Sequence, residues 1–347
     1  MAVVNFSGKS SIGSLGGSCF SGCGKLKELT FESPISEMGA RCFENCSSLE
    51  RVEFSSQCTF TSLEDNSFYN CTSLEDVQLP VSLQKIGKSA FVGCDNLCKI
   101  IVPENVRSIG FSCFSGCKSL SEVSLSSSLK EISQNCFSWC SALEDISIPA
   151  SVRTIGSWAF VGANLKEVRF SDGLVGIGSY SFSKNINLTK VTIPSTVEAL
   201  GTGCFDDCNA LSEIACLAVT PPSLQGVSAY LPMFPSDIAS NCTLYVPEES
   251  IQKYIDDKNW SVFNQIKAYK NTSGIDGVSL GSNAQVEAGE GRIYVQDIPA
   301  GEKVSAYTMA GVPLPVEYTD NNHVMVRTGS GVVLLKIGKK TRKLIIK

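Results

Sequence analysis

A phenylalanine that returns every 22 to 25 residues constrains this chain more than any other feature. It occupies nine positions: Phe20, Phe43, Phe68, Phe91, Phe114, Phe137, Phe160, Phe182 and Phe205. Three residues later a cysteine stands in seven units, and Ala163 and Asn185 take that slot in the other two. An apolar residue also precedes each phenylalanine by five positions. Self-similarity at a fixed period of this length indicates a repeat architecture in which each unit covers the next.

Each unit contains one short alternating run that predicts a strand with one buried face, as in "SLEDVQLP" (Ser73 to Pro80). A proline often ends the run, since proline cannot continue a strand ladder. We therefore expect a right-handed solenoid with a parallel sheet on one side and a rise of roughly 4.8 Å per unit. The predicted structural core includes Phe91, Phe114, Phe137 and Phe160 together with Cys94, Cys117 and Cys140.

The 16 cysteines allow three interpretations. They can be small buried apolar groups with weak S–H donors, which agrees with alanine and asparagine in the same slot. Disulfides between units are a second possibility, chiefly for pairs off the main column such as Cys19/Cys23 or Cys58 and Cys242. A metal site is the third, but the C-F-x-x-C spacing differs from C-x-x-C and His323 is the one histidine. The first interpretation is favoured, so we expect no metal.

No catalytic arrangement is found in the sequence. One histidine excludes most acid–base and nucleophilic schemes, and neither G-x-S-x-G nor a phosphate-binding P-loop occurs. The net charge of −5 gives no nucleic-acid footprint, and no run of about 18 apolar residues could span a membrane. We expect a protein that is not an enzyme, needs no cofactor and acts through its surface.

Two surfaces are candidates for binding. The outward positions of the predicted strands are mildly acidic and include Glu122, Asp145, Glu167 and Arg169, which suits a polar protein contact or simply a solvated sheet. The turns carry Phe111, Trp139, Trp158 and Tyr180 in four consecutive units. A row of exposed aromatic residues is a plausible platform for a protein partner or a glycan, although it can also only stiffen the array.

The chain divides into three segments by pattern. Residues 1–215 hold the nine-unit solenoid, and residues 216–270 read as its C-terminal cap, with a helix in Glu248 to Lys258 and large apolar residues after it. The cap helix places Ile251, Tyr254 and Ile255 on one face. After "NTSG" (Asn271 to Gly274) the period stops, and residues 271–347 alternate as in a small antiparallel β-sandwich. We take Asp206 and Asp207 to lie in a solvated turn.

The segments "IGKSAFVGCDNLCKIIVP" (Ile86 to Pro103) and "ISQNCFSWCSALEDISIP" (Ile132 to Pro149) resemble the BspA-like leucine-rich-repeat family of bacterial surface proteins. The C-terminal "VSAYTMAGVPLP" (Val304 to Pro315) is similar to sorting-type domains of secreted Bacteroidetes proteins. This resemblance implies an α/β-type leucine-rich-repeat solenoid and a secreted or cell-surface location, with any signal segment absent from this chain. It also implies adhesion to host extracellular-matrix proteins or other surface proteins; a carbohydrate-binding module is the alternative.

Overall fold

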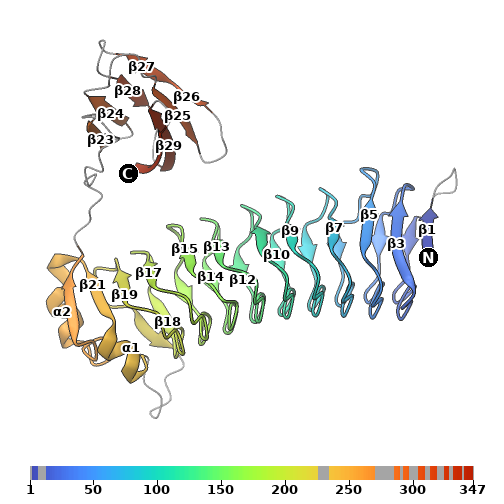
Figure 1. Cartoon of the computed structure of the whole chain (residues 1–347), viewed down its shortest axis with the longest axis horizontal. Coiled ribbons are helices and arrows are strands. Elements are labelled where there is room, and N and C mark those ends of the chain that lie inside the picture. Colours follow the sequence, from blue (N-terminus) through green and yellow to red (C-terminus); the bar gives the residue numbers. More distant parts are fainter. Residues whose placement is uncertain are drawn as a thin grey trace. The chain divides into compact units, whose positions relative to one another are not determined.

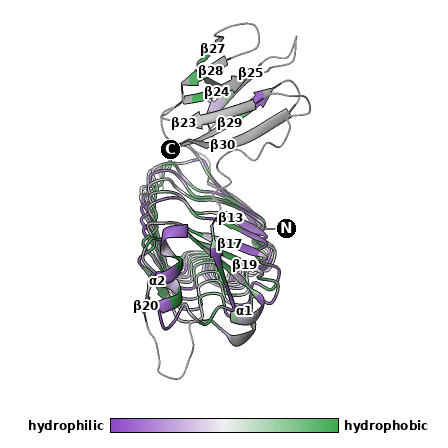
Figure 2. Ribbon diagram, turned by 90° about the vertical axis from the view of Figure 1, so that its left-hand side faces the viewer, coloured by the Kyte–Doolittle hydropathy of each residue, from purple (hydrophilic) through white to green (hydrophobic). Residues whose placement is uncertain are grey.

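The computed structural model describes residues 2–6, 13–225 and 234–269, and eight strands of the C-terminal region. The chain forms two compact units, Met1–Tyr269 and Lys270–Lys347. In the first unit similar coils follow one another from β1 to the C-terminal helices (Figure 1), and a view along the stack shows the coils superposed (Figure 2). No helix among the described residues is long and apolar enough to cross a membrane.

One strand from each coil belongs to a row along the first unit; these strands pair in parallel within four successive sheets, which together we call the first ladder. Its members are β1 (Ala2–Phe6), β3 (Leu26–Phe31), β5 (Arg51–Phe54), β7 (Asp76–Gln78), β9 (Lys99–Ile101), β11 (Glu122–Ser124), β13 (Asp145–Ser147), β15 (Glu167–Arg169), β17 (Lys190–Ile193), β19 (Glu213–Cys216), β21 (Thr243–Val246) and β22 (Gln265–Ala268). The middle residue of β7, β9 and β13 is buried and its neighbours are exposed, as the alternation in the sequence predicts.

A second row of short parallel strands, not anticipated from the sequence, runs along another side of the coils in three successive sheets, which together we call the second ladder. It consists of β2 (Ser14–Leu15), β4 (Glu37–Met38), β6 (Ser62–Leu63), β8 (Lys85–Ile86), β10 (Ser108–Ile109), β12 (Glu131–Ile132), β14 (Thr154–Ile155), β16 (Gly176–Ile177), β18 (Ala199–Gly201) and β20 (Ser223–Gln225). The apolar residue five positions before each phenylalanine lies in these strands and faces inward, as Ile86 and Ile132 do.

Backbone hydrogen bonds also join the phenylalanine-containing turns of neighbouring coils. The backbone N–H of Phe91 donates to Cys113 O at 2.8 Å, and that of Phe114 donates to Cys136 O at 2.8 Å. Strands and turns therefore account for the described coils up to residue 225, and no helix occurs within them. The α/β class expected from the resemblance is corrected to a β-solenoid, because backbone hydrogen bonds between coils replace the crossover helix.

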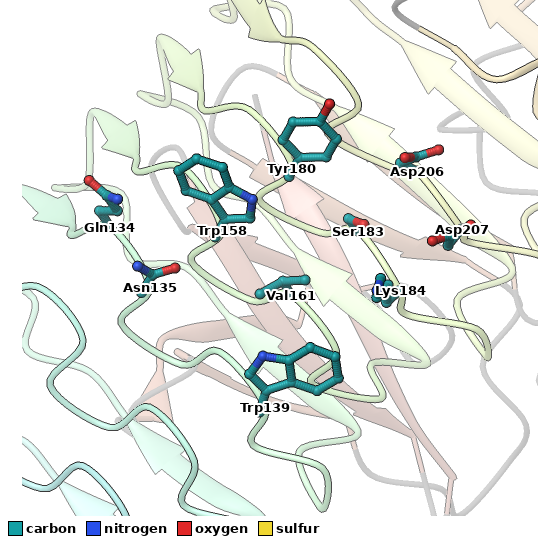
Figure 3. Close-up of a pocket in the computed structure, with 10 residues that line it drawn as sticks. All are labelled: Gln134, Asn135, Trp139, Trp158, Val161, Tyr180, Ser183, Lys184, Asp206 and Asp207. Atoms are coloured by element: carbon teal, nitrogen blue, oxygen red, sulfur yellow. The ribbon is translucent and has the colours of Figure 1, made fainter.

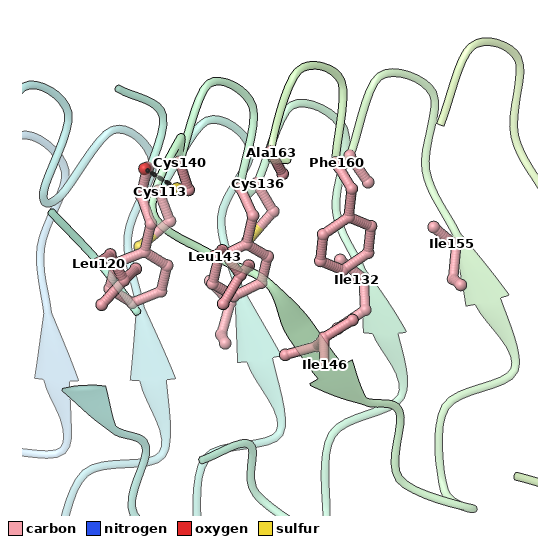
Figure 4. Close-up of a cluster of buried hydrophobic side chains, with 14 of the residues drawn as sticks. Cys113, Leu120, Ile132, Cys136, Cys140, Leu143, Ile146, Ile155, Phe160 and Ala163 are labelled. Carbon is pink, nitrogen blue, oxygen red and sulfur yellow. Dashed lines mark hydrogen bonds between the residues drawn. The ribbon is translucent and has the colours of Figure 1, made fainter. Parts of the chain in front are cut away.

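The repeated phenylalanines form a continuous internal column. Phe43 and the later members are at most 1% exposed, while Phe20 in the first coil is half-buried. Neighbouring rings have centroids 5.0–5.7 Å apart and planes within 17° of parallel, an offset arrangement that aromatic pairs favour. Figure 4 shows Phe160 beside Ala163, with Cys140 and Leu143 in the preceding coil. Burial of each ring contributes on the order of 1.5–3 kcal/mol.

A second column runs beside the rings and is made of thiols. Cys94, Cys117 and Cys140 are fully buried, and each Sγ donates to the carbonyl of the phenylalanine one coil earlier at 3.1–3.2 Å. Asn185 does the same with its amide, since Nδ2 donates to Phe160 O at 2.9 Å. Its Oδ1 also accepts from Leu165 N at 2.7 Å, in the coil that is one residue short. The cysteine slot is therefore a small buried donor position, and all described cysteines are free thiols.

The region expected to cap the solenoid continues both ladders before it closes them. β20 pairs with β18, and β21 and β22 extend the first ladder beyond β19. Between them lie α1 (Ser236–Asn241), η1 (Glu248–Ser250) and α2 (Ile251–Asp256).

Large aromatic side chains close the end of the core. Tyr254 and Trp260 are fully buried; Tyr254 Oη donates to Ala218 O at 2.8 Å and Trp260 Nε1 to Pro222 O at 3.1 Å. Ile255, expected on the same buried face as Tyr254, is 45% exposed, because the helix ends one residue later and lays only one side on the core.

The described strands of the C-terminal unit form two four-stranded antiparallel sheets. The first has the order β23 (Gln285–Gly289), β24 (Arg292–Gln296), β28 (Val324–Arg327), β27 (Val316–Tyr318); the second has the order β26 (Pro313–Leu314), β25 (Val304–Thr308), β29 (Gly331–Ile337), β30 (Lys340–Ile346). The antiparallel strands agree with the alternating sequence, whereas the sandwich arrangement and the sorting role stay predictions. His323 lies outside the described residues.

Candidate binding surfaces

The first-ladder strands present a face of alternating exposed side chains. Glu122, Asp145, Glu167 and Arg169 are all exposed on β11, β13 and β15. Their charges are paired: Arg169 contacts Glu167 at 2.6 Å and Asp145 at 3.6 Å, and Glu122 contacts Lys99 at 2.8 Å. The net charge of this face is therefore less negative than the number of its acidic residues suggests, because lysine and arginine side chains pair with the carboxylates. Exposed pairs of this kind contribute only about 0–1 kcal/mol to stability.

This strand face also contains a shallow depression of about 470 Å³ between β9, β11 and β13. Ile101 lines it and is 60% exposed. An apolar group surrounded by charged residues is the common arrangement of a protein-binding patch, with an apolar centre and a polar rim.

Every phenylalanine turn contains two residues in the left-handed conformation, one two positions before the phenylalanine and one two positions after it. Most coils place glycine, asparagine or serine there, and of these glycine and asparagine tolerate positive φ best. Trp139 (φ 60°), Trp158 (φ 56°) and Tyr180 (φ 56°) are the aromatic exceptions. A bulky side chain in this region costs of order 1 kcal/mol or more, so three of them in consecutive coils oppose the local preference.

The three aromatic residues surround one depression of about 460 Å³ at the turn edge of the solenoid. Trp139 is 52% exposed, Trp158 is 39% exposed and Tyr180 is half-buried. The rings of Trp158 and Tyr180 are parallel within 5°, with centroids 5.9 Å apart. Figure 3 shows the three rings spread around the depression with their flat faces in view.

Glycines in the next coil make room for two of these rings. A Cβ added to Gly162 would lie 2.5 Å from Trp139 Cε3, and one added to Gly203 would lie 2.5 Å from Tyr180 Cε1. Trp139 and Tyr180 therefore extend over the backbone of the neighbouring coil, where only a residue without a side chain fits.

Polar side chains complete the lining of this depression. They are Gln134, Asn135, Ser183, Lys184, Asp206 and Asp207. Lys184 Nζ lies 5.7 Å from the ring centroid of Trp139, within the range of a cation–π contact. The sequence alone does not single out Lys184, and it predicts only a solvated turn for the two aspartates. Alignment of the position two residues after each phenylalanine, which brings Trp139, Gly162, Lys184 and Asp207 into register, could have found the group.

Phe111 does not belong to this group, although the sequence places it in the same row. It is 47% exposed and lines a separate depression along the second ladder, with Lys88 Nζ 5.1 Å from its ring centroid. The reason is its position three residues before the phenylalanine, which lies between β10 and the left-handed residue Ser112.

The titration behaviour of the described residues reflects packing. Burial raises the pKa of the Cys46 thiol to about 11, and a hydroxyl and an N–H of Ser127 lower the pKa of Glu104. No group of three or more histidine, cysteine, aspartate or glutamate side chains suited to a metal ion occurs in the described part of the chain.

Comparison with known proteins identifies one family. A family profile described as "BspA type Leucine rich repeat region" matches in six copies, over residues 2–118, 61–184 and 130–220. No curated protein matches the chain.

Solved structures are similar as well. A leucine-rich repeat protein from Bacteroides ovatus is 27% identical, with a TM-score of 0.61 over 77% of this chain and 68% of its own. A leucine-rich repeat protein of T. pallidum is 22% identical over 54% of this chain and 77% of its own, with a TM-score of 0.41. A leucine-rich cell surface protein from Faecalibacterium prausnitzii is 23% identical over 78% of this chain and 80% of its own, with a TM-score of 0.36.

Proposed function

The chain belongs to the BspA-type leucine-rich-repeat family, and from this premise we propose that it is a non-enzymatic binding protein, secreted or displayed at the cell surface. The partner is a host extracellular-matrix protein or another surface protein, and the strand face of the solenoid binds it. The family's association with bacterial surfaces supports the location, and the architecture supports the mode of action.

The observation that carries this proposal is that each coil uses separate sets of residues for its interior and for its exposed face. Phenylalanines, thiols and the apolar strand residues are committed to the interior, whereas the first ladder leaves a regular array of charged and polar side chains exposed. An array of this kind offers a flat, extended contact area, with Ile101 as an apolar centre and the pairs around Glu122 and Arg169 as a rim.

Surface plasmon resonance with the full chain tests the proposal. Fibronectin, laminin, collagen and fibrinogen are immobilised in turn, and at least one is expected to bind. The variant Ile101→Asp with Glu122→Lys should weaken that binding at least tenfold, because it removes the apolar centre and reverses one rim charge. Glu131→Lys, an exposed acid on the second ladder, is the matched control and should bind like the original chain. Equal binding by all three proteins would overturn the assignment of the strand face, and no binding to any of the four matrix proteins would overturn the assignment of a matrix partner.

A further inference from the structure

We propose that the depression framed by Trp139, Trp158 and Tyr180 is a carbohydrate site that holds neutral, pyranose-based oligosaccharides. This site lies at the turn edge and uses none of the residues assigned above to the protein contact. It is therefore a second binding function rather than a detail of the first.

The backbone gives the first reason. Trp139, Trp158 and Tyr180 occupy left-handed positions that glycine, asparagine or serine fill in most other coils, although Arg41, Lys184 and Asp207 take three of them. The neighbouring Gly162 and Gly203 provide the space that two of the rings need. Local strain that persists at three adjacent positions, and that simpler residues would relieve, marks a functional site.

The exposure of the rings gives the second reason. If the aromatic residues only stiffened the stack, their faces would be covered, yet Trp139 and Trp158 keep 52% and 39% of their surface exposed. The parallel rings of Trp158 and Tyr180 come from adjacent coils and are 5.9 Å apart. They form a platform on which consecutive sugar rings can place their apolar C–H faces.

The polar lining gives the third reason and selects the ligand class. Asn135, Gln134 and Ser183 can donate and accept hydrogen bonds, Lys184 only donates, and the aspartates accept when ionised. Sugar hydroxyls both donate and accept, so they can satisfy this mixed set around an apolar platform. A quaternary ammonium ligand fits less well, because Lys184 Nζ already lies over the Trp139 ring. An anionic glycan would face Asp206 and Asp207.

Tryptophan fluorescence provides a direct assay. The chain has three tryptophans, two of which line the depression, whereas Trp260 is fully buried in the cap. Acrylamide quenching of the full chain therefore reports mainly on Trp139 and Trp158. The probes are cellohexaose, laminarihexaose, maltohexaose, mannohexaose and chitohexaose. At least one should protect the fluorescence from quenching, with saturation at millimolar concentration or below.

The variants use residues that the same turn accepts elsewhere in the chain. Trp158→Asn copies Asn135 in the preceding coil, and Trp139→Gly copies Gly116. Each should lower affinity at least tenfold, measured by calorimetry with the oligosaccharide that binds, while the melting temperature stays equal or rises because strain is relieved. Phe111→Ser, which changes an exposed aromatic residue outside the depression, should bind like the original chain.

Three outcomes would overturn the proposal. They are failure of all five oligosaccharides to protect the tryptophans, full affinity in Trp158→Asn, and a large drop in melting temperature in both variants. Loss of matrix-protein binding in Trp158→Asn would instead assign the depression to the protein partner. Loss of matrix-protein binding confined to the Ile101 and Glu122 variant would not contradict the glycan site. The two proposals can therefore be refuted independently.

Discussion

The Sγ atoms of Cys19 and Cys42 lie 3.1 Å apart across the first two coils of the solenoid. Both residues stand one position before the column phenylalanine, Cys19 is exposed and Cys42 is buried. An exposed thiol in contact with a buried one is open to oxidation at the surface, while most thiols of this chain are enclosed.

We predict that these two thiols form a disulfide when the protein meets an oxidant. Diamide should take up two electrons and two protons from the pair, leaving a Cys19–Cys42 bond that peptide mapping detects after alkylation. The cross-link closes a loop between adjacent coils and should stabilise the first coil by about 3 kcal/mol.

The matched control is the pair Cys113 and Cys136, which occupies the same slot in adjacent coils but is fully buried. Both should remain reduced under the same treatment. Cross-linking of Cys113 to Cys136 at the same rate, or full alkylation of Cys19 after diamide, would contradict the prediction.

Gly162→Ala should destabilise the protein by about 1–3 kcal/mol. Gly162 has φ 63°, and the added Cβ would meet the Trp139 ring at 2.5 Å. Urea unfolding measures the change, and the exposure of Trp139 to acrylamide should rise as its ring is displaced. Gly176→Ala is the control, because the nearest atom to its Cβ is 3.8 Å away. An equal effect of the two substitutions would show that the ring is not held against Gly162.

Asn185→Ala should cost more than Cys117→Ala, by about 2 kcal/mol. The asparagine satisfies Leu165 N as well as the carbonyls of Phe160 and Phe182, whereas the Cys117 thiol donates only to Phe91 O. Removing the amide leaves a buried N–H without a partner, and removing a thiol leaves a small void. Denaturant midpoints of the two variants compare the costs, and Asn185→Cys should recover only part of the loss. A smaller cost for Asn185→Ala would mean that the short coil rearranges.

The free energy of unfolding should fall as pH rises from about 9 to about 11. Burial raises the pKa of Cys46 and Cys216 to about 11 from the ordinary value of 9.0, so the folded chain keeps protons that the unfolded chain loses in this window. A thiol whose pKa is raised in the folded state stabilises the fold fully below pH 9. This stabilisation is lost as the pH rises through the folded-state pKa. A fully buried thiol contributes a loss of about 1.4 kcal/mol per pH unit.

Urea unfolding at several pH values, with a reductant present, measures this slope. Cys216→Ala is the informative variant, because it should reduce the slope by about one proton while the chain remains folded. Burial also raises the pKa of Tyr254, which acts in the same direction. A free energy of unfolding that is constant between pH 8 and 11 would contradict the role of the buried thiols.

The interior of the solenoid could be predicted from the sequence because a buried slot places the same demand on every coil. Phe91 and Phe114 occupy equivalent surroundings, so their chemistry repeats and the period reveals the stack. The family, the parallel ladder and the antiparallel C-terminal strands followed from the same kind of pattern. The hydrogen-bonding role of Asn185 could not be predicted from this pattern, since its hydrogen bonds depend on a coil shortened by one residue.

Which side chains lie next to one another on the surface could be seen only in the tertiary structure. Sequence position tells which side of its own coil a residue occupies, but it does not tell which neighbours it meets in the coils before and after. Phe111 separates from the group because it stands one residue before the left-handed slot that Trp158 and Tyr180 occupy, and Lys184 reaches the Trp139 ring across Gly162. Stacking brings together side chains more than 40 residues apart, and no single repeat contains that information.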